Sequence, residues 1–414
     1  MNSGKPSFSG TTTVAGNGAV SKAILVLSLA AFGSTISQRV MDPLLPRLVM
    51  EFGVSLGAAS WAITCFTIGY ACCQPFFGLI GDSRGKYRVI AWGCAASAAA
   101  SLLCALAPNL PMLLLARAIA GGMIAAIIPL SMAWIGDVVD YEHRQPVLAR
   151  FLMGSILGAS AGQLLGGMSA DYLGWRLALF LVAGLFLAAT LMMFAVRRHL
   201  PQRALATHPI QHHALRHLWI EYVQVVTHRW AKVVLLSVFV EGTVVFGAFA
   251  FFASHLHRQL SLSLSAAGSI VMLFGLGGLL FATASRTLVR RLGEAGLSRW
   301  GACILSAAMV ALSLSPNVWV AAPACFLVGL GFYMLHNTLQ INATQMAPER
   351  RGAAVSMFAF CFFVGQSAGV SMAGWLVERI GIPSVIQISA LGVLLVGNIF
   401  ARQQRLKMLA VAAG

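Results

Sequence analysis

Long apolar runs are the feature that most constrains how this chain can fold. The 414 residues form a succession of apolar stretches, most about 20 residues long, separated by short polar breaks. A helix needs ~20 mostly apolar residues to cross a bilayer. Because 58% of the residues are hydrophobic and only 10% are charged, an ordinary soluble protein is excluded. The sequence therefore predicts an all-α integral membrane protein.

The apolar runs predict twelve transmembrane helices. They fall at residues 22–41, 58–80, 88–107, 111–136, 146–170, 175–196, 231–254, 264–287, 298–315, 318–341, 352–376 and 382–401. Most lysines and arginines fall in the breaks on one side. The breaks on the other side hold only Arg47, Arg176, Arg258 and Arg379. The positive-inside rule then places both termini in the cytoplasm. This topology explains the net charge of +16, and no nucleic-acid partner is expected.

The polar break at residues 197–230 divides the predicted helices into two sets of six. It holds six histidines, but none has the Cys/His spacing of a metal site, so we expect a solvated basic linker and no bound metal. The predicted organisation is a disordered cytoplasmic tail (1–21), an N-terminal six-helix bundle (22–196), a His-rich cytoplasmic linker (197–230), a C-terminal six-helix bundle (231–402) and a cytoplasmic tail (403–414).

The two halves of the chain repeat each other. A shift of 207 residues superposes Glu142 on Glu349, Arg144 on Arg351, Gly158 on Gly365, Ser160 on Ser367, Ala161 on Ala368, Gly162 on Gly369, Gly167 on Gly374 and Gly174 on Gly381. An offset of half the chain length indicates duplication of a six-helix unit. Two such pseudo-symmetric bundles around a central cavity are typical of alternating-access transporters, in which one bundle rocks against the other.

The break after the second predicted helix reads GLIGDSRGKYR. This pattern resembles the loop signature of the major facilitator superfamily. The matching positions are Gly78, Asp82, Gly85, Lys86 and Arg88, while Ser83 stands where a basic residue is usual. Gly85 permits a tight turn, and Gly78 would let a neighbouring helix approach closely. The resemblance implies a cytoplasmic gate in which Asp82 faces a helix N-terminus or an arginine and bridges the two bundles in the outward-facing state.

The fifth predicted helix carries glycines at four-residue spacing. They are Gly154, Gly158, Gly162 and Gly166, with Gly167 next to the last. This pattern is similar to the signature of proton antiporters in the superfamily, although Gln163 occupies the position of the family's proline. The alternative is a smooth face for helix packing alone.

Two ionisable residues of the N-terminal half resemble the family's coupling residues. Arg117 lies inside the fourth predicted helix, where a charge is costly and usually functional, and a structural salt bridge is the alternative. Asp42, followed by Pro46, resembles the acid at the end of the first helix in drug/proton antiporters. It could instead lie in the outer loop or pair with Arg39. We expect Asp42 and Arg117 to form the coupling pair.

The C-terminal half adds one acid deep in an apolar run, Glu241. An unpaired carboxylate there would be protonated or partnered, so Glu241 is either a proton or cation site or part of a helix–helix hydrogen bond. The candidates for a substrate cavity are His336, Asn337, Gln340, Tyr70 and Phe246. A single histidine or aromatic residue in such a protein is also a common packing residue.

These patterns predict a transporter and not an enzyme. The chain has no phosphate-binding G-x-x-x-x-G-K-[ST] motif, and no cofactor is expected. The resemblance implies a monomeric secondary transporter of the bacterial inner membrane that exports a small organic molecule or drug in exchange for protons. Its partners are then the small-molecule substrate, protons and the lipid bilayer. The alternatives are proton-coupled uptake of a sugar, nucleoside or organic acid, and a non-transporting sensor or scaffold on the same fold.

Overall fold

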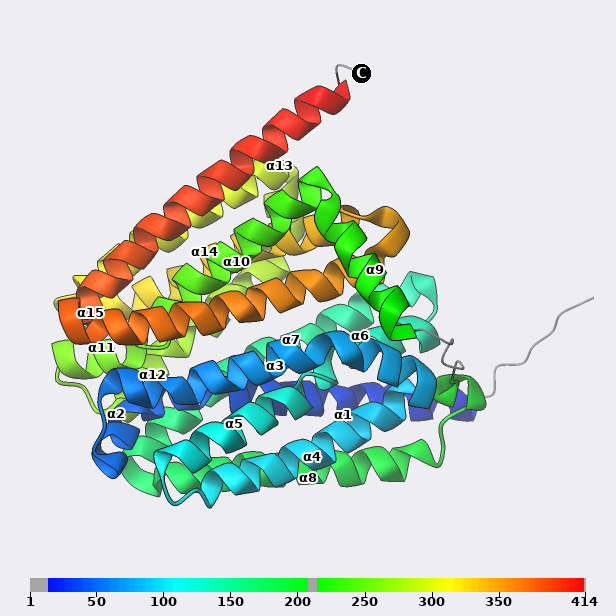
Figure 1. The fold of residues 1–414 in the computed structure, drawn as a ribbon, viewed down its shortest axis with the longest axis horizontal. Helices are drawn as coiled ribbons and strands as arrows, with labels where there is room; N and C mark the ends of the chain where they lie inside the picture. Colours follow the sequence, from blue (N-terminus) through cyan, green and yellow to red (C-terminus); the bar gives the residue numbers. More distant parts are fainter. Residues whose placement is uncertain (1–13, 208–213, 413–414) are drawn as a thin grey trace, which may run out of the picture.

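The computed structural model describes residues 14–207 and 214–412, which are helical and contain no β-strand (Figure 1). The helices are α1 (Val14–Arg39), α2 (Met41–Phe52), α3 (Leu56–Arg84), α4 (Lys86–Ala105), α5 (Leu110–Ile124), α6 (Ile127–Val138), α7 (Tyr141–Met168), η1 (Ser169–Leu173), α8 (Trp175–Arg197), η2 (Gln202–Leu205), α9 (Ala214–Thr227), α10 (Arg229–Phe249), α11 (Phe252–Gln259), α12 (Leu264–Val271), α13 (Leu273–Ser313), α14 (Val318–Gln345), η3 (Pro348–Arg350) and α15 (Arg351–Ala412).

Ten helical stretches of the described residues are long and apolar enough to cross a membrane. The two longest, of 50 and 62 residues, each contain a glycine with a non-helical backbone, Gly293 in α13 and Gly381 in α15. The orange and red parts of α15 accordingly meet at a sharp angle in Figure 1. Each of these stretches is long enough for two crossings. The ten stretches are thus compatible with twelve crossings, and that number stays a prediction.

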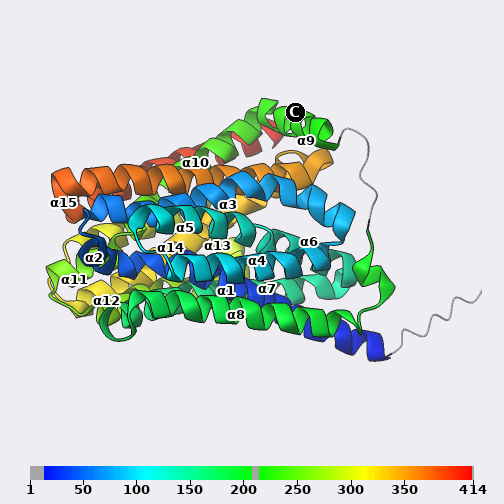
Figure 2. The same cartoon turned by 60° about the horizontal axis from the view of Figure 1, so that its bottom comes forward.

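The helices form two groups that pack against each other. One contains α1 to α8 together with η1, and the other contains α10 to α15. The groups meet mainly where α3 lies beside α15 and where α7 lies beside α12 (Figure 2). We call them the N-terminal and C-terminal halves. The ends near the α2–α3 connection and near α9 are named the outer end and the cytoplasmic end, after the predicted orientation.

The backbone confirms the sequence repeat. Gly174, which follows η1, and Gly381, which divides α15, both have φ of 80°. Two further positions, Ser55 and Ser263, lie 208 residues apart, one residue from the offset of the repeat. Both are N-caps, because their side chains accept hydrogen bonds from backbone N–H groups at the starts of α3 and α12. The same turns and caps therefore recur in both halves.

The predicted tails differ from the structure. Residues 1–13 of the N-terminal tail lie outside the described residues, but α1 already begins at Val14, so disorder up to residue 21 is wrong. Ala19 and Val20 are buried, which gives this segment apolar contacts that stabilise a helix. At the other end, α15 continues through most of the predicted tail to Ala412. The boundaries of the predicted domains otherwise stay predictions.

The linker is more structured than expected. Its histidines His208, His212 and His213 lie outside the described residues, but η2 and α9 are helical. Tyr222 of α9 is buried, and its hydroxyl lies 3.4 Å from the carbonyl oxygen of Pro75 and 3.3 Å from Oγ of Ser356. A fully solvated linker is therefore wrong for α9, because its buried tyrosine contacts both halves.

Candidate functional site

Arg117 of α5 is buried among helices of the N-terminal half. Only 1% of its surface is exposed. Its Nε donates to the carbonyl oxygen of Ala62 at 3.1 Å, and its Nη1 donates to that of Ser37 at 3.0 Å. The guanidinium also stacks 4.2 Å above the ring of Phe66. Backbone oxygens and an aromatic face thus compensate this buried charge and tie α5 to α1 and α3.

Asp42 is also buried, so it does not lie in an exposed outer loop, which was one of the two predicted alternatives. The first helix ends at Arg39, and α2 begins at Met41 after the single residue Val40, with Asp42 in its first turn. The Asp42 carboxylate accepts a hydrogen bond of 2.7 Å from Nε2 of Gln163 in α7. It also lies 3.8 Å from Nη1 of Arg39. The residue that replaces the family's proline is therefore the partner of the acid.

The structure does not form the expected salt bridge between Asp42 and Arg117. Among the described residues, the ion pair of Asp42 is with Arg39, and Arg117 donates to carbonyl oxygens instead. The physical reason is the break at Val40, which starts a new helix at Met41 and sets Asp42 one turn beyond Arg39. The sequence alternative in which Arg39 is the partner is the one that the geometry shows.

Glu241 forms the second buried acid site. It has no exposed surface, and its Oε2 lies 2.8 Å from Nδ1 of His336 in α14. The imidazole is stacked on Phe332 at a centroid distance of 5.0 Å and contacts Phe362 at 4.6 Å. Asn337 and Gln340 also lie on α14, and both are partly buried. The structure thus joins two residues that the sequence had assigned to separate roles.

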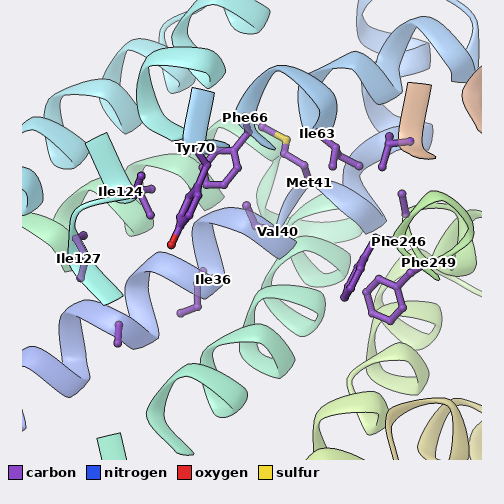
Figure 3. Close-up of a cluster of buried hydrophobic side chains, with 14 of the residues drawn as sticks. Ile36, Val40, Met41, Ile63, Phe66, Tyr70, Ile124, Ile127, Phe246 and Phe249 are labelled. Atoms are coloured by element: carbon purple, nitrogen blue, oxygen red, sulfur yellow. The ribbon is translucent and has the colours of Figure 1, made fainter. Parts of the chain in front are cut away.

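The predicted aromatic candidates lie where the two halves meet. Tyr70 of α3 stacks on Phe363 of α15 at 3.9 Å between centroids. Phe246 of α10 carries the Arg39 guanidinium 4.1 Å above its ring, so this cation from the N-terminal half rests on the C-terminal half. Figure 3 shows Phe246 and Phe249 facing the junction of α1 and α2. Edge contacts then connect Phe246 to Phe362, and through it to His336.

The glycines of α7 form the packing face that the sequence predicted. A methyl group on Gly158 or Gly166 would collide with the backbone of α1 or with Val40, and one on Gly162 would fit only tightly against Ile36. The helices α1 and α7 therefore approach closely along this row. Gly167 points elsewhere, because a methyl group there would meet the carbonyl of Leu264 in α12. Its contact therefore crosses between the halves.

The loop motif at the cytoplasmic end forms an ion cluster within one half. Nζ of Lys86 lies 3.0 Å from Asp82 and 2.7 Å from Asp137, beside a cavity of about 260 Å³. Gly85 has φ of 87°, as a tight turn requires, and Arg88 is exposed.

Two expected contacts of this motif are not formed in this conformation, and the gate itself stays a prediction. The partner of Asp82 is a lysine of the same half, not an arginine or helix N-terminus of the other half. Gly78 is not a close-approach position, because a methyl group added there would meet nothing within 4 Å among the described residues. Gly78 and Asp82 are both exposed at this end of α3, and Lys86 lies one turn after Asp82.

Sequence reasoning missed several residues that join the halves. Ser367 donates to Oγ1 of Thr67 at 2.7 Å, and Ser371 to Oγ1 of Thr64 at 3.3 Å. Short hydroxyl side chains in apolar helices give little signal on their own, because they also bond to their own helix backbone. The acid Glu378 was also missed, because it lies two residues beyond the predicted helix 352–376.

Residues 27–370 match the sequence model of the Major Facilitator Superfamily. The chain belongs to this superfamily. It is 27% identical over 346 residues to the uncharacterized MFS-type transporter YceJ of Bacillus subtilis, covering 82% of this chain and 85% of the relative. It is also 28% identical over 174 residues to the multidrug export protein EmrB of Escherichia coli, covering 42% of this chain and about a third (34%) of EmrB.

A solved structure shows the same fold. A mutant form of the nucleoside transporter NupG superposes with a TM-score of 0.76 at 13% identity, covering 91% of this chain and 98% of NupG. Membership of the superfamily and this fold identify the chain as a transporter that crosses the membrane several times.

Proposed function

We propose that this superfamily member exports a small organic molecule in exchange for protons, by alternating access. The observation that carries the proposal is the Glu241–His336 pair, whose buried carboxylate and imidazole lie 2.8 Å apart beside the meeting surface of the halves. A buried acid is expensive in a membrane protein unless it has a function. An imidazole partner adds a second group that can take up or release a proton.

The pair can exchange a proton for a substrate. One proton shared between Glu241 and His336 leaves the pair with no net charge, and a second proton makes it positive. Because the pair lies among the rings of Phe332, Phe358 and Phe362, water screens this change in charge only weakly. An organic cation that binds beside the carboxylate would compete with the second proton, and competition for one site gives exchange.

The remaining candidates have supporting roles in the proposal. Asp42 balances the charge of Arg39, and Arg117 holds α1, α3 and α5 in one arrangement. Tyr70, Phe246, Asn337 and Gln340 are candidate walls of the substrate path. The loop motif around Asp82 serves as the cytoplasmic gate in the opposite conformation. The transporter acts as a monomer in a bacterial inner membrane with both termini in the cytoplasm.

Export is favoured over uptake by one relative, because EmrB is described as a multidrug export protein. The fold itself does not decide direction. A compound library is first screened against the purified protein, and the compound that most raises its melting temperature is taken as the substrate for transport assays.

The test uses the purified protein in proteoliposomes with that compound. We expect its uptake into vesicles to rise when the lumen is more acidic than the medium and to fall when the gradient is reversed; the opposite response would show symport. Glu241→Gln should lose the response to the gradient but keep counterflow of the compound. The matched control is Glu294→Gln, since Glu294 lies in the same half but bonds to the amides of Asn342 and Gln404. An unchanged response in Glu241→Gln would contradict the proposal.

A further inference from the structure

Two carboxylates at the outer end reach across to the opposite half. Asp171 of η1 accepts hydrogen bonds from the backbone N–H groups of Ser265 (2.6 Å) and Leu264 (3.3 Å) at the start of α12. Glu378 of α15 accepts one from the N–H of Gly57 (3.0 Å) at the start of α3. Each half thus supplies an acid that caps a helix of the other.

The two contacts are closely related by the repeat, although Asp171 also accepts its shorter hydrogen bond from Ser265, whose counterpart Ala58 donates to Ser55 instead. Asp171 and Glu378 are separated by 207 residues, and so are Gly57 and Leu264. This is the offset that relates the two halves in the sequence. Each acid also precedes by three residues a glycine with φ of 80°, Gly174 or Gly381 in turn. The acids, their donors and the turns that follow are therefore related by the internal repeat.

The start of each capped helix has donors left for an incoming acid. The first N–H groups of a helix have no partner within the helix, and they carry partial positive charge. Ser55 and Ser263 each satisfy one such group, that of Ala58 or Ala266. The earlier N–H groups remain, and these are the ones that Glu378 and Asp171 accept from. When the halves separate at this end, these N–H groups must form hydrogen bonds with water instead.

Close packing couples the caps to closure of the outer end. A methyl group on Gly374, one turn before Glu378, would collide with Ser60 and Gly57 of α3. A methyl group on Gly167, one turn before Asp171, would collide with Leu264 of α12. The carboxylates therefore reach their donors only when these glycine contacts are closed.

We propose that Asp171 and Glu378 are the two gating residues that hold the outer end closed, each by capping a helix of the opposite half. The inference rests on the alternating access of the proposed function. Because both residues are exposed at the outer surface, breaking the caps leaves no buried charge behind. The caps favour the closed conformation without locking it.

The test measures access to the surface between the halves. A cysteine is introduced by Ser371→Cys, next to Thr64, and its labelling by a membrane-impermeant maleimide is followed in right-side-out vesicles of the full-length protein. Protein without this cysteine gives the background from the native cysteines. We expect labelling to be faster by about threefold in Asp171→Ala or Glu378→Ala and by about tenfold in the double variant, as expected for losing one or two helix caps.

The matched control is Glu51→Gln. Glu51 lies at the same end and pairs with Arg176 at 2.6 Å, but both residues belong to the N-terminal half. Its labelling should equal that of the parent. An unchanged rate in the double variant, or an equal rise in Glu51→Gln, would overturn the inference. If the alanine variants do not insert, the near-isosteric pair Asp171→Asn and Glu378→Gln carries the same test, with a rise of about twofold expected.

The labelling needs neither substrate nor protons, which separates it from the proposed function. Faster labelling in a protein that shows no proton-driven exchange would support the gate and refute the exchange. Proton-driven exchange with unchanged labelling would do the reverse.

Discussion

The two buried acids of the candidate site differ in the kind of partner that each has. Asp42, in the N-terminal half, lies 3.8 Å from the guanidinium of Arg39 and accepts from the amide of Gln163. Glu241, in the C-terminal half, faces the imidazole of His336 at 2.8 Å. A guanidinium keeps its charge, whereas an imidazole can take up or release a proton.

The difference suggests a division of labour between the halves. Removing the charge of Asp42 would leave Arg39, itself buried, without its ionic partner. Removing the charge of Glu241 leaves a histidine that can adopt its neutral form. The first pair is therefore suited to holding a fixed arrangement, and the second to changing its charge during transport.

The largest effect that tests this comparison is on stability. We expect Asp42→Asn to lower the free energy of unfolding by about 3 kcal/mol, because it leaves a buried guanidinium without its carboxylate partner. Glu241→Gln should have a much smaller effect, since His336 can become neutral. Melting temperatures of the two purified variants check this. Adding Arg39→Gln to Asp42→Asn should restore much of the loss, and equal destabilisation by Asp42→Asn and Glu241→Gln would break the comparison.

Much of the fold was predictable because its signals are local. Apolar runs give the helices, the 207-residue offset gives the two halves, and the glycine row of α7 gives its contact with α1. The linker helix α9 was missed because the sequence around it is polar and rich in histidine, and its apolar face is short. Tyr222 lies on that face and is buried.

The sequence could predict individual residues of the site, but not which residues interact with each other. Charged residues in apolar runs drew attention to Arg117 and Glu241 directly. Their partners depend on how distant helices pack: His336 is 95 residues from Glu241, and Gln163 is 121 from Asp42. Spacing along one helix could suggest Arg39 as a partner of Asp42, but no local pattern specifies a contact between separate helices.

A second prediction concerns the imidazole itself. His336→Gln should lower the rate of proton-driven exchange by about tenfold and flatten its dependence on pH, because an amide keeps a hydrogen bond but cannot take up a proton. Transport in proteoliposomes over a pH series measures this. The control is His255→Gln, since His255 is also buried in the C-terminal half but contacts the carbonyl of Leu312 at 3.2 Å. If the pH dependence of exchange flattens similarly in both variants, His336 is not the specific proton-coupling residue.

A third, smaller effect tests the amide partner of Asp42. Gln163→Leu removes the donor 2.7 Å from the carboxylate while keeping a side chain of similar size. We expect a loss of about 1 kcal/mol of unfolding free energy, because Arg39 remains to balance the charge. Gln366→Leu is the control in the other half, since Gln366 is equally buried but accepts a long contact of 3.4 Å from the neutral amide of Gln38. A larger loss in Gln366→Leu would show that hydrogen bonding at Asp42 is unimportant.

The smallest effect comes from the same chemical change made where water has access. Asp82 is about half exposed, and its partner Lys86 also contacts Asp137. In Asp82→Asn the lysine keeps one carboxylate, and solvent screens what is lost, so we expect a change in unfolding free energy below about 0.5 kcal/mol. Asp42→Asn and Asp82→Asn remove the same charge, so the difference between their melting temperatures isolates the contribution of burial. Comparable losses in the two variants would show that burial of the partner is not what makes Asp42 costly to neutralise, and the contrast between Asp42 and Glu241 would then lose its physical basis.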